Sequence, residues 1–286
     1  MVKLTFWLLA LAVLAPTTWA SADAEDAPPE LTPPVIPEDL VGDLVLPSAS
    51  RPIPFKPSER LDFKLGWGMF KVAKASLTTE TIDYQDTEAL HFTLQTKTRG
   101  FINAVYPVDN HSWSWTDVNM ERSFGYETDQ NEGGDHRQRK TTIDWSTQTA
   151  HFKDLKTEEM KDPVMVLEGT FDPLSIVYYV RTLDFEVGDR LVVPTTNGKE
   201  FFFTIINVTK KVTRKFLSGT HEAYVIEPKI KDLGGVFKKS KDGKVVFYFS
   251  ADEYKFPLRL ESEVTVGSFW AEMTEAEVNG ERIEFD

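Results

Sequence analysis

The chain has 286 residues, and its 45 acidic side chains outnumber its 32 basic ones, which gives a formal net charge of -13. This balance repels phosphate backbones and anionic surfaces over long range, so nucleic acid is excluded as an expected partner. The chain contains no cysteine. Disulfides, thiol chemistry and a lipid anchor on an N-terminal cysteine are therefore excluded, and stability must come from a buried core.

Residues 1–22 have the pattern of a secretory signal peptide. Lys3 precedes an apolar run from Leu4 to Ala15, and small residues follow around Ala20 and Ala22. The run is shorter than the roughly 20 apolar residues that a membrane-spanning helix needs. We therefore expect cleavage, a location in the periplasm or outside the cell, and no integral membrane segment in the mature protein.

Residues 23–53 are rich in proline and acidic residues and contain almost no aromatic side chains. Such a segment buries too little apolar area to offset its chain entropy, so it is predicted to be a flexible, extended arm. The pair Val35–Ile36 and the run from Leu40 to Leu46 leave local docking open. The remaining residues, 54–286, are long enough for a single large β domain.

Strand patterns dominate this domain. Leu61, Phe63, Leu65 and Trp67 alternate with polar residues or glycine, as expected for a half-buried strand. Further extended segments are predicted at residues 72–82, 91–98, 123–128, 140–145, 149–155, 201–208, 223–230, 244–250, 258–266 and 269–278. Glycine-rich turns such as residues 133–134 separate some of these segments, which favours antiparallel neighbours.

One helix is predicted after residue 172. Asp172 is suited to capping the helix and Pro173 to its first turn, and an apolar face follows at Leu174, Ile176, Val177, Val180 and Leu183. The strands at 201–206 and 245–249 are apolar on both faces, so the helix, the arm or a ligand must cover their second face. These patterns predict a mainly β fold: a curved antiparallel sheet or incomplete β-barrel with one covering α-helix.

Several motifs carry a resemblance to a known family. They are PSERL at 57–61, KLGWG at 64–68, DPLS at 172–175, YYVR at 178–181, DGK at 242–244 and YFS at 248–250. The chain resembles the DUF3108 family over about residues 54–278, and this resemblance implies an exported bacterial protein of unknown function. The inferred architecture also resembles the LolA and LolB type of periplasmic lipoprotein carrier, an analogy of fold only.

Catalytic and metal-binding patterns are weak in this sequence. None of the five histidines lies in a zinc-binding helix motif or a hydrolase signature. Asp109 and His111 would share one face of a strand, either as half of a metal site or as a local polar pair beside Trp113. A glycosidase-like pair of carboxylates stays open, because acidic residues are abundant. The expectation is a protein that is not an enzyme and that needs no cofactor or metal.

Aromatic residues supply the candidate ligand-binding positions, because flat apolar rings with polar edges can line a lipid cavity or stack on sugars. Arg181 is added because it shares a helix face with Tyr178, where its guanidinium needs either a carboxylate or a ligand anion. An internal salt bridge is the alternative for Arg181, and plain core packing is the alternative for the aromatic residues. The candidates are Trp67, Trp113, Trp115, Tyr178, Arg181 and Trp270.

Two functions follow from these observations. The first is a non-enzymatic periplasmic binding or carrier protein for a hydrophobic or amphiphilic envelope component, such as a lipid or glycolipid. The alternative is an envelope assembly or scaffold protein that binds another protein or cell-wall glycan, for example through a sheet edge. A cavity beneath the helix, with Tyr178 and Arg181 at its rim, would favour the carrier. A filled core would favour the scaffold.

Overall fold

The structure is a computed structural model that describes residues 31–229, 244–264 and 267–285. The expected signal peptide and residues 23–30 of the expected arm lie outside this range. Helices among the described residues are the 3-10 helix η1 (Glu38–Asp43), α1 (Gly100–Val105) and α2 (Ser175–Thr182).

Strands make up most of the described chain. The first run comprises β1 (Glu59–Trp67), β2 (Phe70–Tyr84), β3 (Thr87–Thr98), β4 (Val108–Asp117), β5 (Ser123–Glu132), β6 (Asp135–Asp144), β7 (Thr149–Asp154) and β8 (Val164–Met165). The second run comprises β9 (Arg190–Thr196), β10 (Phe201–Phe216), β11 (Gly219–Pro228), β12 (Lys244–Ser250), β13 (Pro257–Val264), β14 (Gly267–Val278) and β15 (Glu281–Arg282). The fold is therefore mainly β, as the sequence predicted.

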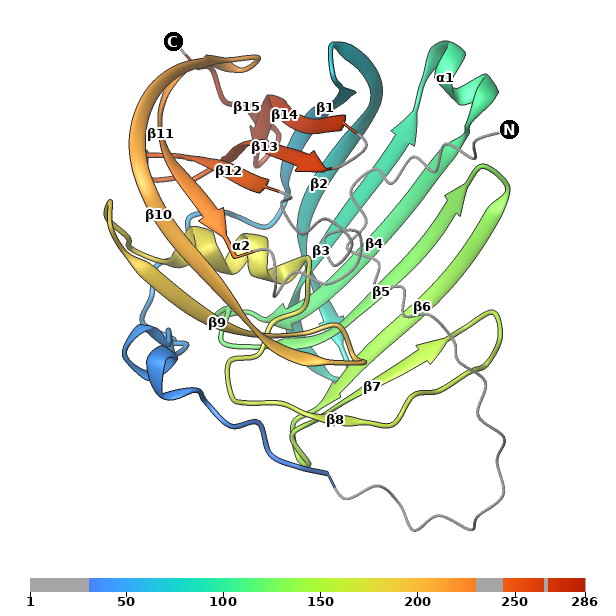
Figure 1. The fold of residues 1–286 in the computed structure, drawn as a ribbon, viewed down its shortest axis with the longest axis vertical. Coiled ribbons are helices and arrows are strands. Elements are labelled where there is room, and N and C mark those ends of the chain that lie inside the picture. The colour runs from blue at the N-terminus through green and yellow to red at the C-terminus, as the bar shows by residue number, and fades with distance from the viewer. Residues whose placement is uncertain (1–30, 230–243, 265–266, 286) are drawn as a thin grey trace.

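All of these strands belong to one 15-stranded antiparallel sheet. Within each run, neighbours in sequence are neighbours in the sheet, and the pairing of β1 with β14 joins the two runs. The sheet ends at β8 on one side and at β9 on the other, so it curves without closing (Figure 1). This arrangement confirms the predicted curved antiparallel sheet.

Helix α2 lies inside the curve of the sheet (Figure 1). The alternation of β1 directs Leu61 and Leu65 inward, where both are fully buried. Phe55 and Phe92 meet Tyr178 of α2 in this core, with ring centroids 5.1 and 4.0 Å from the tyrosine ring. Aromatic and aliphatic side chains thus fill the space between α2 and β1 to β3.

The buried face of α2 matches the predicted one in part, since Leu174, Val180 and Leu183 are buried as predicted. Ile176 and Val177 are only half-buried, whereas Tyr178 and Arg181 are each 1% exposed. The hydrophobic pattern was misleading because the arginine, which a hydropathy scale places in solvent, has a buried acidic partner. The cap was predicted correctly: the Asp172 carboxylate accepts hydrogen bonds from the backbone N–H groups of Leu174 and Ser175.

The arm docks on the sheet over part of its length, which is the alternative that the sequence left open for the run from Leu40 to Leu46. Leu40 of η1 is buried against Val192 of β9 and Ile205 of β10, and the Val45 N–H bonds the Val192 carbonyl at 2.9 Å. Val192 and Ile205 are cross-strand partners whose neighbours Val193 and Ile206 belong to the main core. The arm therefore covers the second apolar face of these strands, which is why residues 40–46 are ordered.

Candidate functional site

Two of the predicted ligand-binding residues, Tyr178 and Arg181, are core residues. The Arg181 guanidinium forms a two-pronged ion pair with Glu59 of β1, at 2.6 and 2.8 Å, and both side chains have no exposed surface. Burial lowers the pKa of Arg181, but the charge and hydrogen bonds of Glu59 outweigh it and raise the pKa. The predicted position at a cavity rim is wrong for both residues, and the internal salt bridge is present.

Trp67 and Trp270 lie close together where β1 meets β14. Trp67 stacks on Phe269 at a centroid distance of 6.3 Å, and the Trp270 indole N–H donates to the Gly68 carbonyl at 2.9 Å. A Cβ atom on Gly66 would come within 2.2 Å of the Trp270 ring. The glycine at position 66 is therefore required for this packing, and the two tryptophans are half-buried parts of the sheet surface.

Trp113 and Trp115 lie on the outer face of β4, which is the face that does not contact α2. Each is half-buried and stacks on a histidine, Trp113 on His111 at 5.5 Å and Trp115 on His91 at 5.2 Å. The six predicted residues thus occupy three separate places and do not form one site.

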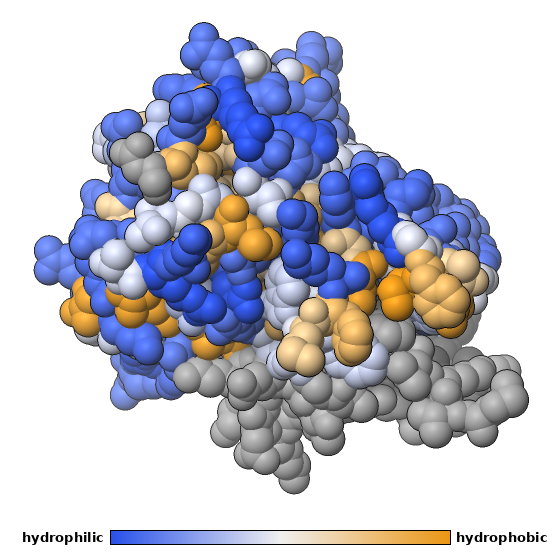
Figure 2. Space-filling view, turned by 90° about the horizontal axis from the view of Figure 1, so that it is seen from above, coloured by the Kyte–Doolittle hydropathy of each residue, from blue (hydrophilic) through white to orange (hydrophobic). Residues whose placement is uncertain are grey.

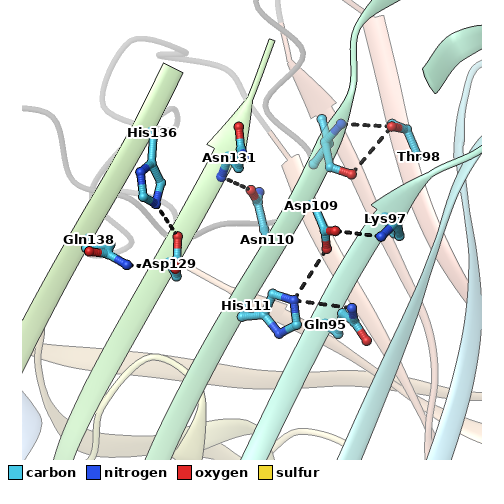
Figure 3. A network of polar contacts seen from close by, with 11 residues as sticks. Gln95, Lys97, Thr98, Asp109, Asn110, His111, Asp129, Asn131, His136 and Gln138 are labelled. Carbon is cyan, nitrogen blue, oxygen red and sulfur yellow. Dashed lines mark hydrogen bonds and ion pairs between the residues drawn. The ribbon is translucent and has the colours of Figure 1, made fainter. Parts of the chain in front are cut away.

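Polar pairs continue along this outer face (Figure 3). Asp109 accepts a hydrogen bond from Lys97 at 2.6 Å and lies 3.3 Å from His111, while Asp129 bonds His136 at 2.7 Å. Among the described residues, no group of three or more potential metal ligands comes together. Asp109 and His111 therefore form the local polar pair that was the alternative to a metal site.

A more unusual set of polar side chains lies on the inner face of β4 to β6. The hydrophobic core gives way there to polar residues, although several of them are buried, with Gln130 at 3% exposure and Glu132 at 8%. Lys199, in the turn between β9 and β10, joins them from across the curve. We call this set the inner polar patch; it consists of Asn110, Tyr126, Thr128, Gln130, Glu132, Arg137, Arg139 and Lys199.

The register of the sheet explains why these residues meet. Asn110 pairs with Gln130 and Gln130 with Arg137, while Thr128 pairs with Arg139 on the next row of the same face. The β9–β10 turn reaches this face through the Thr141 hydroxyl, which donates to the Asn197 carbonyl at 3.0 Å. A Cβ atom on Gly198 would lie 2.5 Å from that hydroxyl oxygen, so glycine allows the close approach that places Lys199 near the patch.

Only some of the hydrogen-bond donors in the inner polar patch have a partner among the described residues. The Asn110 amide donates to Glu132 at 2.6 Å, and an Arg139 Nη1–H donates to the Gln130 amide oxygen at 3.4 Å. The Gln130 amide nitrogen and the Arg139 Nε atom are buried without a hydrogen-bond partner. Since buried donors are normally paired, these two atoms are available to a bound molecule.

Local charge in the patch is positive and incompletely neutralised. Burial, and then the neighbouring charge of Arg137, lower the pKa of Arg139; burial, and then Arg139 and Lys161, lower that of Lys199. Within the described residues, neither Arg139 nor Lys199 lies within 4.0 Å of a carboxylate oxygen. An anion bound between them would relieve both the mutual repulsion and the unpaired donors.

A carboxyl group and a phenol hydroxyl lie beside these cations. Burial raises the pKa of Glu132, although the hydrogen bond from Asn110 and the charge of Arg137 oppose the shift. Burial likewise raises the pKa of Tyr126, whose hydroxyl lies 3.5 Å from that of Ser112. Burial thus favours the uncharged form of both groups, and the Tyr126 hydroxyl donates its hydrogen bond to Ser112.

Sequence reasoning missed the inner polar patch. Strands β5 and β6 are polar on both faces, so alternation does not reveal which side is buried. The usable signal was the contrast with β10 and β12, which are apolar on both faces. Strands β5 and β6 lie between other strands of the sheet, so one of their polar faces must point inward. That face makes the interior of the sheet polar at this place.

Comparisons with known proteins give the family. A sequence model of the family described as "Protein of unknown function (DUF3108)" matches residues 62–274. None of the curated proteins matches the chain.

Two solved structures illustrate the level of structural similarity. A beta-barrel-like protein of the domain of unknown function DUF1849, from Brucella abortus, has a TM-score of 0.46 and 9% identity, over 78% of this chain and 98% of that one. The hypothetical protein CT021 of Chlamydia trachomatis has a TM-score of 0.32 and 11% identity, over 78% and 88%. Neither similarity is close enough to support a statement about function.

Proposed function

The chain belongs to the DUF3108 family, whose function is unknown, and from that premise we propose that it is a non-enzymatic envelope protein that binds or carries an amphiphile with an anionic head group. A lipid or glycolipid of the bacterial envelope is the expected class of ligand. The inner polar patch is the proposed binding site for the head group.

The observation that carries this proposal is a pair of cations at the inner face that receive only longer-range compensation, including that of Asp154. Arg139 lies on β6 and Lys199 in the β9–β10 turn, the charge of Arg139 lowers the pKa of Lys199, and neither forms an ion pair with a described carboxylate. A partly buried cation without a close counter-charge favours the binding of an anion. A phosphate or carboxylate group would supply that counter-charge and would accept hydrogen bonds from Arg139 and Gln130.

Apolar side chains adjoin the charged groups, and they are buried against one another. The Lys199 ammonium lies 4.1 Å from the centre of the Phe152 ring, and Phe152 is the cross-strand neighbour of Thr141. The next row on the same face pairs Ile143 with Ala150, and both are buried together with Val166. In this proposal the head group binds at the charged row, and the apolar tail inserts among these side chains on the neighbouring row.

The groups in the patch are suited to binding charge, which supports a carrier in preference to an enzyme. Guanidinium, ammonium and amide groups recognise anions through charge and hydrogen bonds. The Glu132 carboxyl, the best placed acid, is held by Asn110. A carrier of this kind would release its ligand chemically unchanged.

The filled core beneath α2 favours the scaffold alternative by the criterion given for the sequence, but the sheet edges give that alternative little support. Leu44 forms a parallel bridge to Val192 of the edge strand β9, and Phe171 forms another to Thr195. The other edge strand, β8, is only two residues long. Short and covered edges are poor templates for adding a partner strand.

The proposal is tested by titrating the lipid-free protein with dansyl-labelled lysophosphatidylglycerol below its micellar concentration. We expect saturable binding by the wild type. Arg139→Gln should weaken it about tenfold, which corresponds to the loss of one charge-assisted hydrogen bond. Lys199→Gln should act in the same direction.

The matched control is Arg60→Gln, because Arg60 is an arginine of the same sheet whose ion pair with Asp62 is exposed to solvent. It should bind the probe as the wild type does. Equal affinity of wild type and Arg139→Gln, or no binding by either protein, would reject the inner polar patch as the site.

A further inference from the structure

Four large apolar side chains are exposed at one end of the sheet. Met69 and Phe70, where β1 turns into β2, are 94% and 71% exposed, and Phe101 and Val105 of α1 are 79% and 66% exposed. We call these four residues the apolar rim. Most soluble surfaces expose large apolar residues singly, so a group of this size at one end of the molecule indicates an interaction surface.

The pairing of β2 with β3 brings the two halves of the rim together. Ala73 lies opposite Thr98, and the Arg99 N–H reaches the Val72 carbonyl at 3.4 Å, so the β1–β2 turn and the start of α1 lie at the same end of adjacent strands. Figure 1 shows both at the upper end of the molecule. Figure 2 looks onto this end and shows hydrophobic surface beside strongly hydrophilic surface.

Basic residues surround the rim. Lys64, Lys74 and Lys97 are cross-strand neighbours on the outer faces of β1, β2 and β3, and only Lys97 has a carboxylate partner, Asp109. Lys71 and Arg99, which flank the two halves of the rim, are exposed. Among the described residues, no carboxylate oxygen lies within 4.0 Å of the ammonium or guanidinium nitrogens of Lys64, Lys71, Lys74 or Arg99.

We infer that the apolar rim and these cations form a docking surface for an anionic lipid bilayer. Aromatic and methionine side chains that project from a turn and a short helix can enter the interfacial region of a membrane, while lysine and arginine contact the head groups. The net charge of -13 repels an anionic membrane from most of the protein. The local excess of positive charge at the apolar rim therefore orients this end of the protein towards an anionic bilayer.

The docking surface goes beyond the proposed function but is consistent with it. The β5–β6 turn, next to Glu132, lies at the same end of the sheet as α1, since the Gly133 N–H bonds the Pro107 carbonyl at 2.8 Å. The inner polar patch begins at this end with the row that pairs Val108 with Glu132. A bilayer at the rim would place lipid head groups beside the patch.

Co-sedimentation of the full chain with vesicles tests the inference. Vesicles of phosphatidylcholine alone are compared with vesicles that also contain phosphatidylglycerol. The wild type should sediment with the anionic vesicles and release at high salt. The double variant Phe70→Ser/Phe101→Ser should lower the partition coefficient at least about tenfold, because each buried phenylalanine contributes strongly to transfer from water. Lys71→Glu/Arg99→Glu should abolish the preference for phosphatidylglycerol.

Val187→Ser is the matched control, since Val187 is also exposed, at 53%, but lies in the loop between α2 and β9. It should bind vesicles as the wild type does, and circular dichroism should show that all variants are folded. A wild type that stays in the supernatant with both kinds of vesicle, or rim variants that bind like the control, would overturn the inference and leave the rim to a protein partner.

The two assays together separate this inference from the proposed ligand site. The rim variants Phe70→Ser/Phe101→Ser should lower vesicle binding and leave the titration with the soluble lipid probe unchanged. Failure of vesicle binding with intact binding of the soluble lipid probe would reject the rim alone. Loss of probe binding with intact vesicle binding would reject the inner polar patch alone.

Discussion

Arg181 shows how one buried residue can resemble a ligand-binding group in the sequence. Its guanidinium is held by Glu59, by the Tyr254 carbonyl at 3.1 and 3.2 Å, and by the rings of Phe55 and Phe256. Four of its five N–H donors are used by these partners, and the side chain has no exposed surface at which an external anion could bind. The partner lies 122 residues away in sequence, which is why the helix pattern alone could not identify it.

Replacing Arg181 should therefore affect stability and not ligand affinity. Arg181→Met leaves the Glu59 carboxylate buried without a counter-charge, which should lower the free energy of unfolding by about 3–5 kcal/mol. Arg60→Met, which breaks an exposed pair, should cost less than about 1 kcal/mol. Urea unfolding measures both. Equal stabilities for the two variants would contradict the structural role of the ion pair.

The buried carboxyl group of Glu132 should make the free energy of unfolding depend on pH. Because burial raises its pKa, the folded state holds the proton more tightly than the unfolded state does. The stability that protonated Glu132 contributes is thus present at low pH and is lost as pH rises from about 4, the ordinary carboxyl range, through the raised value. Burial also raises the pKa of Asp172, which adds a second group with the same sign.

Glu132→Gln should reduce this pH dependence. The neutral amide keeps an acceptor for Asn110 and removes the buried charge, so the variant should gain stability relative to the wild type as pH rises towards neutrality. Urea unfolding at a series of pH values measures the difference. A difference between the two proteins that does not change with pH would show that Glu132 ionises normally in the folded state.

At the scale of elements, the docked arm and α2 show where sequence patterns succeed and where they fail. The strands and the capped helix could be predicted, because alternation and the Asp172–Pro173 step report local requirements. The docking of η1 could only be left open, because its apolar residues lie in an acidic, proline-rich sequence that resembles a disordered linker. The strands that are apolar on both faces, β10 and β12, indicated that a cover was needed but not which segment supplies it.

The arm should therefore contribute to stability. Leu40→Ala removes the residue that packs on Val192 and Ile205, and it should cost about 2 kcal/mol. Val41→Ala, at a neighbouring position that is 59% exposed, should change stability by less than about 0.5 kcal/mol. Thermal or urea unfolding distinguishes the two variants. Trimming by a protease to residue 54 without loss of stability would contradict the docked arm.

At the scale of the whole molecule, the sheet combines an apolar interior around α2 with a polar inner face on β4 to β6. The curved sheet and its extent could be predicted from the sequence. The position of the candidate site could not, because a polar strand with one buried face has the same pattern as a solvent-exposed strand. The aromatic residues that suggested a site are instead distributed over the core, the β1–β14 junction and the outer face.

The central claim is that an anionic amphiphile occupies the inner polar patch, and native mass spectrometry of the protein purified from its native envelope tests it most directly. The wild type should carry a lipid or glycolipid with an anionic head group, and extraction should recover this molecule unchanged. Arg139→Gln should retain about one tenth as much, and Arg60→Gln as much as the wild type. A wild type without bound amphiphile, or equal retention by Arg139→Gln, would contradict the account.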